Sequence, residues 1–121
     1  MAQFSDETPY QLLVATEGHT LLGYAATLRY RPKPAFDGTV EVSIYLAPDI
    51  GSRGVGSVLY GEEFPRCEEH GTRNYLAGVA LPNEQSLAFH RKHRFVDVGT
   101  LVDYARKWGQ PISSTWLQRR V

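Results

Sequence analysis

The pattern of apolar and polar residues in the first third of the chain predicts two strands and a loop. Residues 11–15 form a short apolar run, Gly18 marks a tight turn, and residues 19–30 form a second strand-like run. Two such runs around a glycine are typical of a β-hairpin. Two prolines then exclude a central strand, because proline lacks the backbone donor. We therefore predict a loop over residues 31–39.

A third strand is predicted by the regular alternation of apolar and polar residues over 40–46. Its apolar face carries Val40, Val42, Ile44 and Leu46. Its polar face carries Glu41, Ser43 and Tyr45. A strand with this pattern buries one face and leaves the other open, so we expect the polar residues to face solvent or a site.

A helix is predicted to follow from residue 55, because apolar residues recur there at helical spacing. Pro65 is expected to kink this helix by removing a backbone hydrogen bond, and Gly71 to end it. One apolar stripe contains Val55, Val58 and Leu59, and another contains Tyr60, Phe64 and Cys67. The acidic residues are expected to form a solvated face, namely Glu62, Glu63, Glu68 and Glu69.

The second half of the chain predicts one buried strand, one short helix and two closing strands. Residues 75–81 form a continuous apolar run, as in a buried strand, and Asn83 is a good N-cap for a helix. Residues 95–104 and 112–120 are the predicted closing strands. The order strand, strand, strand, helix, strand, helix, strand, strand predicts a mixed α/β (α+β) fold in a single domain, residues 1–121.

The composition limits the classes of function. The chain has 121 residues, and its 13 basic and 13 acidic residues give zero formal net charge, which argues against electrostatic binding to nucleic acid or a membrane. Cys67 is the one cysteine, so an intramolecular disulfide and a four-cysteine zinc site are excluded. A reducing, cytoplasmic compartment is therefore expected. The polar N-terminus predicts no signal peptide, and no apolar run reaches the roughly 18 residues that span a bilayer.

The segment Gly54-Val55-Gly56 lies between the third predicted strand and the first predicted helix. Backbone N–H groups and the positive end of the helix dipole meet there, which suits an anion such as a pyrophosphate. Ser57 stands where a Walker A loop needs lysine, and Leu59 stands where a dinucleotide fingerprint needs glycine. By itself, the segment is equally consistent with glycines that serve a tight turn and close packing.

Several separated motifs occur in one characteristic order along the chain. They are Thr39 through Leu46, Arg53-Gly54-Val55-Gly56, Ala80-Leu81-Pro82-Asn83-Glu84-Gln85-Ser86 through His90, Phe95, and Arg106-Lys107-Trp108-Gly109. Together they resemble the GNAT superfamily of N-acetyltransferases, in particular its phosphinothricin acetyltransferase-like branch. The resemblance covers nearly the whole chain. It implies the GNAT-like acyl-CoA N-acyltransferase fold and acetyl-CoA as co-substrate, with no metal.

The resemblance also implies how acetyl-CoA is bound. Its pyrophosphate would lie against Arg53, Gly54, Val55, Gly56 and Ser57. Its pantetheine arm would hydrogen-bond to a strand backbone like an added strand, at Ile44, Tyr45 and Leu46. The rest of the cofactor would contact Asn83 and Ser86.

N-acetylation needs a group that takes a proton from the acceptor ammonium, so that a neutral amine attacks the thioester. The resemblance assigns this role to Glu41; the alternative is an ordinary solvent-facing glutamate. Tyr45 and Tyr60 are candidates to donate a proton to the departing thiolate or to line the pocket. Tyrosines of this kind are more often part of the core.

His90 is expected to share one helical face with Asn83 and Ser86. The resemblance implies that His90 assists proton transfer near the reacting sulfur; the alternative is a histidine on the helix surface. His90 and His93 are three residues apart, but no third ligand is evident in the sequence, so we expect no metal site.

The resemblance implies that the chain begins just before the family's second strand. The family's first strand and two helices, which form one wall of the acceptor-amine site, are therefore expected to be missing. An uncovered sheet predicts a two-fold homodimer. Its interface is expected to bury Leu12, Val14 and Leu22, or Trp108, Ile112 and Trp116.

Two functions remain open from the sequence. The first is direct transfer of acetyl from acetyl-CoA to the primary amine of a small, amino-acid-like molecule. The second is a non-catalytic acyl-CoA-binding or interaction module derived from the same fold.

Overall fold

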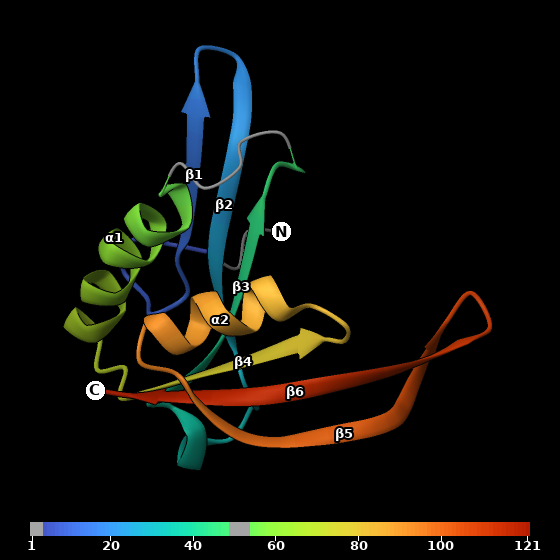
Figure 1. Ribbon diagram of the computed structural model, residues 1–121. Helices are drawn as coiled ribbons and strands as arrows, with labels where there is room; N and C mark the ends of the chain where they lie inside the picture. The colour runs from blue at the N-terminus through green and yellow to red at the C-terminus, as the bar shows by residue number, and fades with distance from the viewer. Residues whose placement is uncertain (1–3, 49–53) are drawn as a thin grey trace. The chain divides into compact units, whose positions relative to one another are not determined.

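The computed structural model describes residues 4–48 and 54–121 of the chain. These residues belong to two compact units, Met1–Arg73 and Asn74–Val121, and each unit is described by itself (Figure 1). Among the described residues, each unit combines three antiparallel strands with one α-helix.

The first unit has the strand order β1-β2-β3, with antiparallel pairing throughout. Its elements are β1 (Leu12–Glu17), β2 (Thr20–Arg29), the 3-10 turn η1 (Pro34–Phe36), β3 (Thr39–Leu46) and α1 (Val55–Glu69). The predicted hairpin, third strand and helix are thus confirmed. The short η1 turn lies inside the predicted loop.

Helix α1 packs against one face of the β1-β2-β3 sheet (Figure 1). Thr27 on β2 contacts Cys67 on α1, and Val42 lies opposite Thr27 in the antiparallel register. Val40 and Val42 are 0% and 5% exposed, so the apolar face predicted for β3 is the face toward the helix. The other face of the sheet carries the polar residues of β3.

A buried polar cluster ties the N-terminal segment to this core. The Thr27 hydroxyl donates to the Pro9 carbonyl at 2.8 Å and accepts from the Gln11 backbone N–H at 2.8 Å. The Cys67 sulfur lies 3.5 Å from the Thr27 hydroxyl and donates to the Pro9 carbonyl at 3.4 Å. The residues around Pro9 therefore lie directly against the thiol, which is fully buried.

The solvated acidic face predicted for α1 is wrong at Glu63, which is 0% exposed. Glu63 lies three residues after Tyr60 and four before Cys67, so the helical period turns it inward with these buried residues. Neither carboxylate oxygen has a hydrogen-bond partner among the described residues. Burial raises the pKa of Glu63 to about 8, and the charge of Arg66 partly opposes this rise.

Two other predictions for α1 concern the apolar stripe that contains Val58 and the effect of Pro65. Val58, expected in an apolar stripe, is 65% exposed, because the packed stripe runs through Leu59, Tyr60, Phe64 and Cys67 instead. Pro65 lies on the exposed side of the helix, and α1 continues past it to Glu69.

The second unit has the strand order β4-β6-β5, again antiparallel. Its elements are β4 (Asn74–Ala80), α2 (Glu84–Lys92), β5 (Val96–Lys107) and β6 (Gln110–Arg120). The predicted elements are present in the predicted order, and the mixed α/β fold class is confirmed. The Asn83 side chain accepts from the Ser86 N–H at 3.0 Å, which confirms the predicted N-cap.

The two closing strands are longer than predicted. Lys107 pairs with Gln110, so β5 and β6 form one hairpin arm with a two-residue turn at Trp108 and Gly109 (Figure 1). Both turn residues have positive φ, 51° and 76°. The expected break between residues 104 and 112 is therefore wrong, since the turn needs only two residues in left-handed conformations.

Candidate active site

The predicted base and one predicted tyrosine lie on the open face of β3, opposite the face that packs on α1. Glu41, Ser43 and Tyr45 alternate with the buried valines, as predicted. The register places Tyr45 opposite Tyr24 of β2, and the two rings stack with centroids 5.5 Å apart. Tyr45 is 42% exposed on this face.

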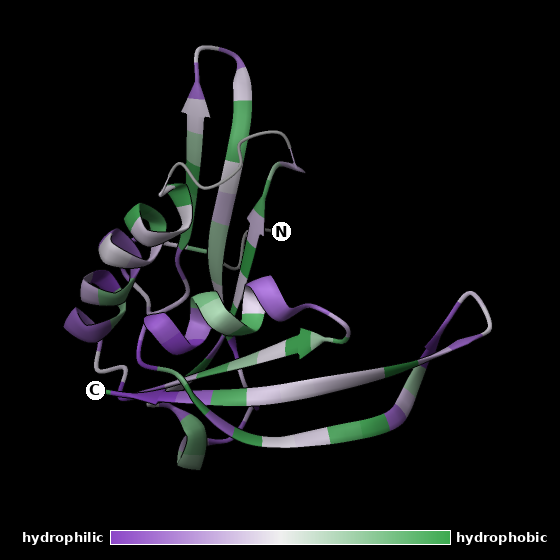
Figure 2. Ribbon diagram, in the orientation of Figure 1, coloured by the Kyte–Doolittle hydropathy of each residue, from purple (hydrophilic) through white to green (hydrophobic). Residues whose placement is uncertain are grey.

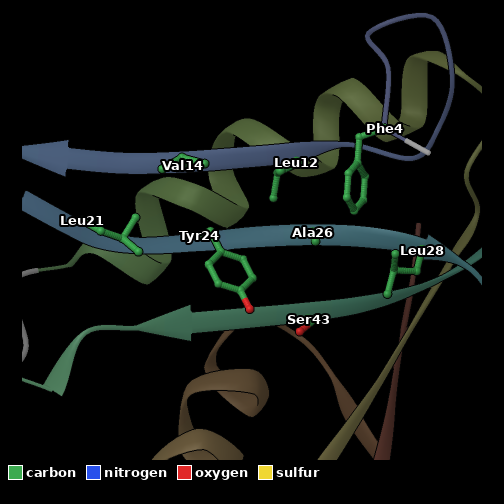
Figure 3. A pocket seen from close by; sticks show the side chains of 8 residues that line it. All are labelled: Phe4, Leu12, Val14, Leu21, Tyr24, Ala26, Leu28 and Ser43. Atoms are coloured by element: carbon green, nitrogen blue, oxygen red, sulfur yellow. The ribbon is translucent and has the colours of Figure 1, made fainter. Parts of the chain in front are cut away.

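A pocket of about 450 Å³ opens on the same face (Figure 3). It is lined by Phe4, Leu12, Val14, Leu21, Tyr24, Ala26, Leu28 and Ser43. Leu28 lies opposite Glu41 in the register, and Ser43 follows Glu41 by two residues on the same face. The candidate base therefore lies beside an apolar pocket. Tyr24 is not among the predicted site residues, although the antiparallel register of the predicted hairpin and third strand places it beside Tyr45.

Gly54 begins α1 in a left-handed conformation, with φ of 79°. A side chain is strained in that conformation, and glycine adopts it freely. The first N–H groups of this 15-residue helix point outward from its N-terminal end, as in any helix. Gly54, the N-cap residue, has no side chain that could accept hydrogen bonds from them. This arrangement fits an anion such as the pyrophosphate predicted for Gly54, Val55, Gly56 and Ser57. The predicted partner Arg53 lies outside the described residues.

His90 is buried in the second unit, at 3% exposure, against the rings of Phe89 and Phe95. Its Nδ1 lies 2.8 Å from the Ser86 carbonyl, which can only accept, so Nδ1 carries the proton and Nε2 keeps its lone pair. Burial lowers the pKa of His90, and the Ser86 hydrogen bond partly opposes this. The ring is therefore neutral at pH 7. The alternative of an ordinary surface histidine is wrong, because the side chain is buried.

The predicted site residues divide between the two units. Glu41, Ile44, Tyr45, Leu46 and Gly54 through Ser57 belong to the first unit. Asn83, Ser86 and His90 lie together at α2 in the second unit, where Ser86 contacts both others. Tyr60 is 1% exposed and stacks on Phe64, so it is part of the core rather than a pocket residue.

Two further features bear on the class of protein. Among residues 4–48 and 54–121, no group of three or more potential metal ligands comes together. Within the same ranges, no helix is both long and apolar enough to cross a membrane.

Comparison with known protein families shows the family to which this chain belongs. The model of the acetyltransferase (GNAT) family matches residues 1–95 of this chain. The chain therefore belongs to the GNAT family of acetyltransferases. The predicted family and fold are confirmed by this match.

Within the family, the chain is similar to phosphinothricin N-acetyltransferases. It is 40% identical over 116 residues to one from Streptomyces coelicolor, with 94% of this chain and 68% of that protein covered. It is 39% identical over 112 residues to one from Alcaligenes faecalis, with 92% and 56% covered. A solved phosphinothricin acetyltransferase from Sinorhizobium meliloti, in complex with AcCoA, superposes with a TM-score of 0.83 at 30% identity, covering 93% of this chain and 61% of that chain. The chain spans between 56% and 68% of the lengths of these proteins.

Proposed function

We propose that this chain is an acetyl-CoA-dependent N-acetyltransferase domain that moves acetyl directly to the primary amine of a small, amino-acid-like molecule. The observation that carries the proposal is the placement of Glu41 and Tyr45 on the open face of β3, beside a pocket. The glycine-headed helix α1 follows that strand along the chain and offers an anion site.

The residues that would hold acetyl-CoA suit its chemistry. The N-terminus of α1, from Gly54 to Ser57, would bind the pyrophosphate through backbone N–H groups, and Arg53 would add a charge. The backbone of Ile44–Leu46 would bind the pantetheine arm as an added strand. Asn83 and Ser86, at the start of α2, would contact the remainder. Bound acetyl-CoA supplies a thioester carbonyl that an amine can attack.

Glu41 would take the proton that the acceptor ammonium must lose before its nitrogen attacks. The nitrogen would then form the new bond to the acetyl carbon as the bond from that carbon to sulfur breaks, and the nitrogen would release its second proton, which replaces the proton that Tyr45 gives to the thiolate. Tyr45, two residues further on the same face, would donate a proton to the departing thiolate. His90 is neutral and carries its proton on Nδ1, so at Nε2 it would accept a proton rather than supply one.

The acceptor, the assembly and the compartment are part of the same proposal. Relatives named phosphinothricin N-acetyltransferases act on an amino-acid-like amine, which supports an acceptor of that kind. Leu12, Val14 and Leu21 are between 43% and 55% exposed on the open sheet, which supports a homodimer that covers them. The one cysteine is free and buried, as suits a reducing compartment such as the cytoplasm.

Two measurements on the chain test the proposal. CoA should raise the melting temperature of the wild-type chain, and a bulky residue at Gly54 or Gly56 should abolish that shift. Glu41→Gln should lower turnover of an amine panel, followed by thiol release, by about 100-fold or more, with the CoA shift unchanged. Glu69→Gln makes the same charge change on the exposed end of α1 and should leave both readings unchanged.

The outcomes separate the two functions left open by the sequence. No thermal shift at millimolar CoA would contradict the cofactor site. Full turnover in Glu41→Gln would remove Glu41 from the mechanism. A clear shift without thiol release from any amine would favour the non-catalytic acyl-CoA-binding module.

A further inference from the structure

Glu63 is unusual because it is an acidic residue inside the first unit. Among the residues that the structure describes, it is the one acidic side chain that is fully buried, at 0% exposure. Neither carboxylate oxygen has a hydrogen-bond partner there. An ionised carboxylate in such a place costs much free energy, so it either keeps a proton or moves to water. The side chain therefore has two favourable states, protonated inside and ionised outside.

The sheet offers this carboxyl no charge. Figure 2 shows hydrophobic and hydrophilic positions mixed along α1, but the strand positions on the helix side of the sheet are apolar or uncharged. They include Leu13, Ala25, Thr27, Val40 and Val42. Arg29 shares this side at the end of β2, but it is exposed and pairs with Asp37 at 3.9 Å. In the N-terminal segment, Tyr10 is partly buried, and Asp6 and Glu7 are exposed.

The neighbouring groups on α1 are uncharged or turned to solvent. Tyr60 lies three residues before Glu63 and Cys67 lies four residues after it, so both share its side of the helix. Burial raises the pKa of each of them, so both are neutral between pH 5 and pH 9. Arg66 partly opposes the rise in the pKa of Glu63, but Arg66 is 46% exposed and pairs with Glu62 at 3.6 Å. The carboxyl therefore titrates in largely uncharged surroundings.

The exposed side of α1 is weakened at the level of Glu63. Gly61 and Pro65 are both exposed and lie two residues before it and two residues after it. Pro65 has no N–H to donate to the carbonyl of Gly61, and glycine is a poor helix former. Helices bend most readily at such residues. The helix can therefore bend between its two halves, and Glu63 lies at the bend.

The two halves of α1 contact the first unit in different ways. The C-terminal half is anchored at Cys67, whose sulfur lies 3.5 Å from the Thr27 hydroxyl. The N-terminal half packs through the buried side chains of Leu59 and Tyr60, and it begins at Gly54, where the pyrophosphate is proposed to bind. A bend in the middle of the helix would therefore displace the proposed cofactor site and leave the anchored end in place.

We propose that a proton on Glu63 controls the binding of acetyl-CoA. While the carboxyl is protonated, the N-terminal half of α1 lies on the sheet, and its first N–H groups are in place for the pyrophosphate. When the carboxyl gives its proton to water, the ionised side chain turns out to solvent, and the N-terminal half of α1 moves with it. This inference rests on the proposed function, because it needs the pyrophosphate site at the start of α1.

The pH range of this switch follows from the two environments of the carboxyl. The pKa of Glu63 is about 8 inside the chain and 4.5 in water. Between these values, each pH unit favours the released helix tenfold, and above about pH 8 both states are ionised and the ratio levels off. From pH 6 to pH 8 the conformational ratio therefore shifts by about fifty-fold. The measured affinity falls only once the released helix is the major form, so we expect a loss of about tenfold.

Calorimetric titration with acetyl-CoA at pH 6, 7 and 8 tests the proposal. Acetyl-CoA has no free thiol to titrate, and comparison of each variant with wild type at the same pH removes any other titration of the ligand. Glu63→Gln and Glu63→Met keep the size of the side chain and cannot ionise. The affinity of wild type relative to either variant should therefore fall about tenfold from pH 6 to pH 8. Glu69→Gln, at the exposed end of α1, should follow wild type at every pH.

Hydrogen exchange of wild type and Glu63→Gln, compared at the same pH, locates the change. Amides of residues 55–62 should lose protection in wild type at pH 8, whereas those of β2 and β3 stay protected. An affinity ratio that is constant from pH 6 to pH 8, or an equal loss of protection across the whole chain, would overturn this inference alone. Failure of wild type to bind acetyl-CoA at pH 6 would overturn the proposed cofactor site as well.

Discussion

Substitution of Glu63 tests the energetics of the α1 core. The side chain is fully buried, and its carboxylate oxygens have no hydrogen-bond partner among the described residues. Burial raises its pKa from 4.5 to about 8. In the folded chain the carboxyl therefore keeps its proton at pH 7, whereas in the unfolded chain it releases it. Glu63→Gln removes this titration and keeps nearly the same shape.

The sign and size of the effect follow from proton linkage. Between pH 4.5 and about 8 the folded state binds more protons at Glu63 than the unfolded state does, so raising the pH favours unfolding. The stability is fully present below pH 4.5 and is lost progressively as the pH rises toward 8. At 1.36 kcal/mol per pH unit, the wild-type chain should lose about 2–3 kcal/mol between pH 5 and pH 7 through this group.

Urea unfolding of wild type and Glu63→Gln at several pH values measures the difference. The difference in free energy of unfolding should move by about 2–3 kcal/mol in favour of the variant from pH 5 to pH 7. Glu62→Gln is the matched control, because Glu62 is exposed and pairs with Arg66 at 3.6 Å on the surface. A difference between wild type and Glu63→Gln that is the same at both pH values would refute the burial of an uncompensated carboxyl.

Three other substitutions, each paired with a control, are expected to change the free energy of unfolding by amounts that thermal or urea unfolding can measure. Gly78→Ala places a Cβ 2.7 Å from the Trp116 ring and should cost about 1–3 kcal/mol, whereas Gly99→Ala enters open space and should change stability by less than about 0.5 kcal/mol. Gly54→Ala should destabilise by about 1 kcal/mol because of its φ of 79°, whereas Gly61→Ala, within the same helix and facing open space, should stabilise by about 0.5–1 kcal/mol. Asn83→Ala removes the cap on the Ser86 N–H and should cost about 1 kcal/mol, with no change for Gln85→Ala, which is exposed in the first turn.

Much of the fold was predictable because its signals are local. The alternation over β3 determines a strand and its buried face, and the apolar run of β4 determines a strand. The turn at Trp108 and Gly109 was not predictable in this way, since its first residue is an aromatic that rarely adopts positive φ. Glu63 was expected on the solvated face of α1 because it is charged, although its position in the helical period turns it toward the core.

The candidate site was predictable only in part. Glu41 and Tyr45 follow from strand periodicity, and Asn83, Ser86 and His90 follow from helical spacing. The apolar pocket did not follow from either period. It combines Phe4 with residues from three strands, so it depends on the register shift between Ala15 and Thr16 and on where the N-terminal segment packs.

The cluster around Cys67 makes the thiol a reporter of local opening. Burial raises the pKa of the thiol to about 11, so in the closed structure only about one molecule in a thousand carries the reactive thiolate at pH 8. Reagent reaches the sulfur only after Pro9 and its neighbours detach from Thr27. The rate of modification by a disulfide reagent, as a ratio to that of the unfolded chain, therefore measures how often the N-terminal segment lifts from the core while the sheet stays folded. No label has to be introduced, because the chain carries its single cysteine at this position.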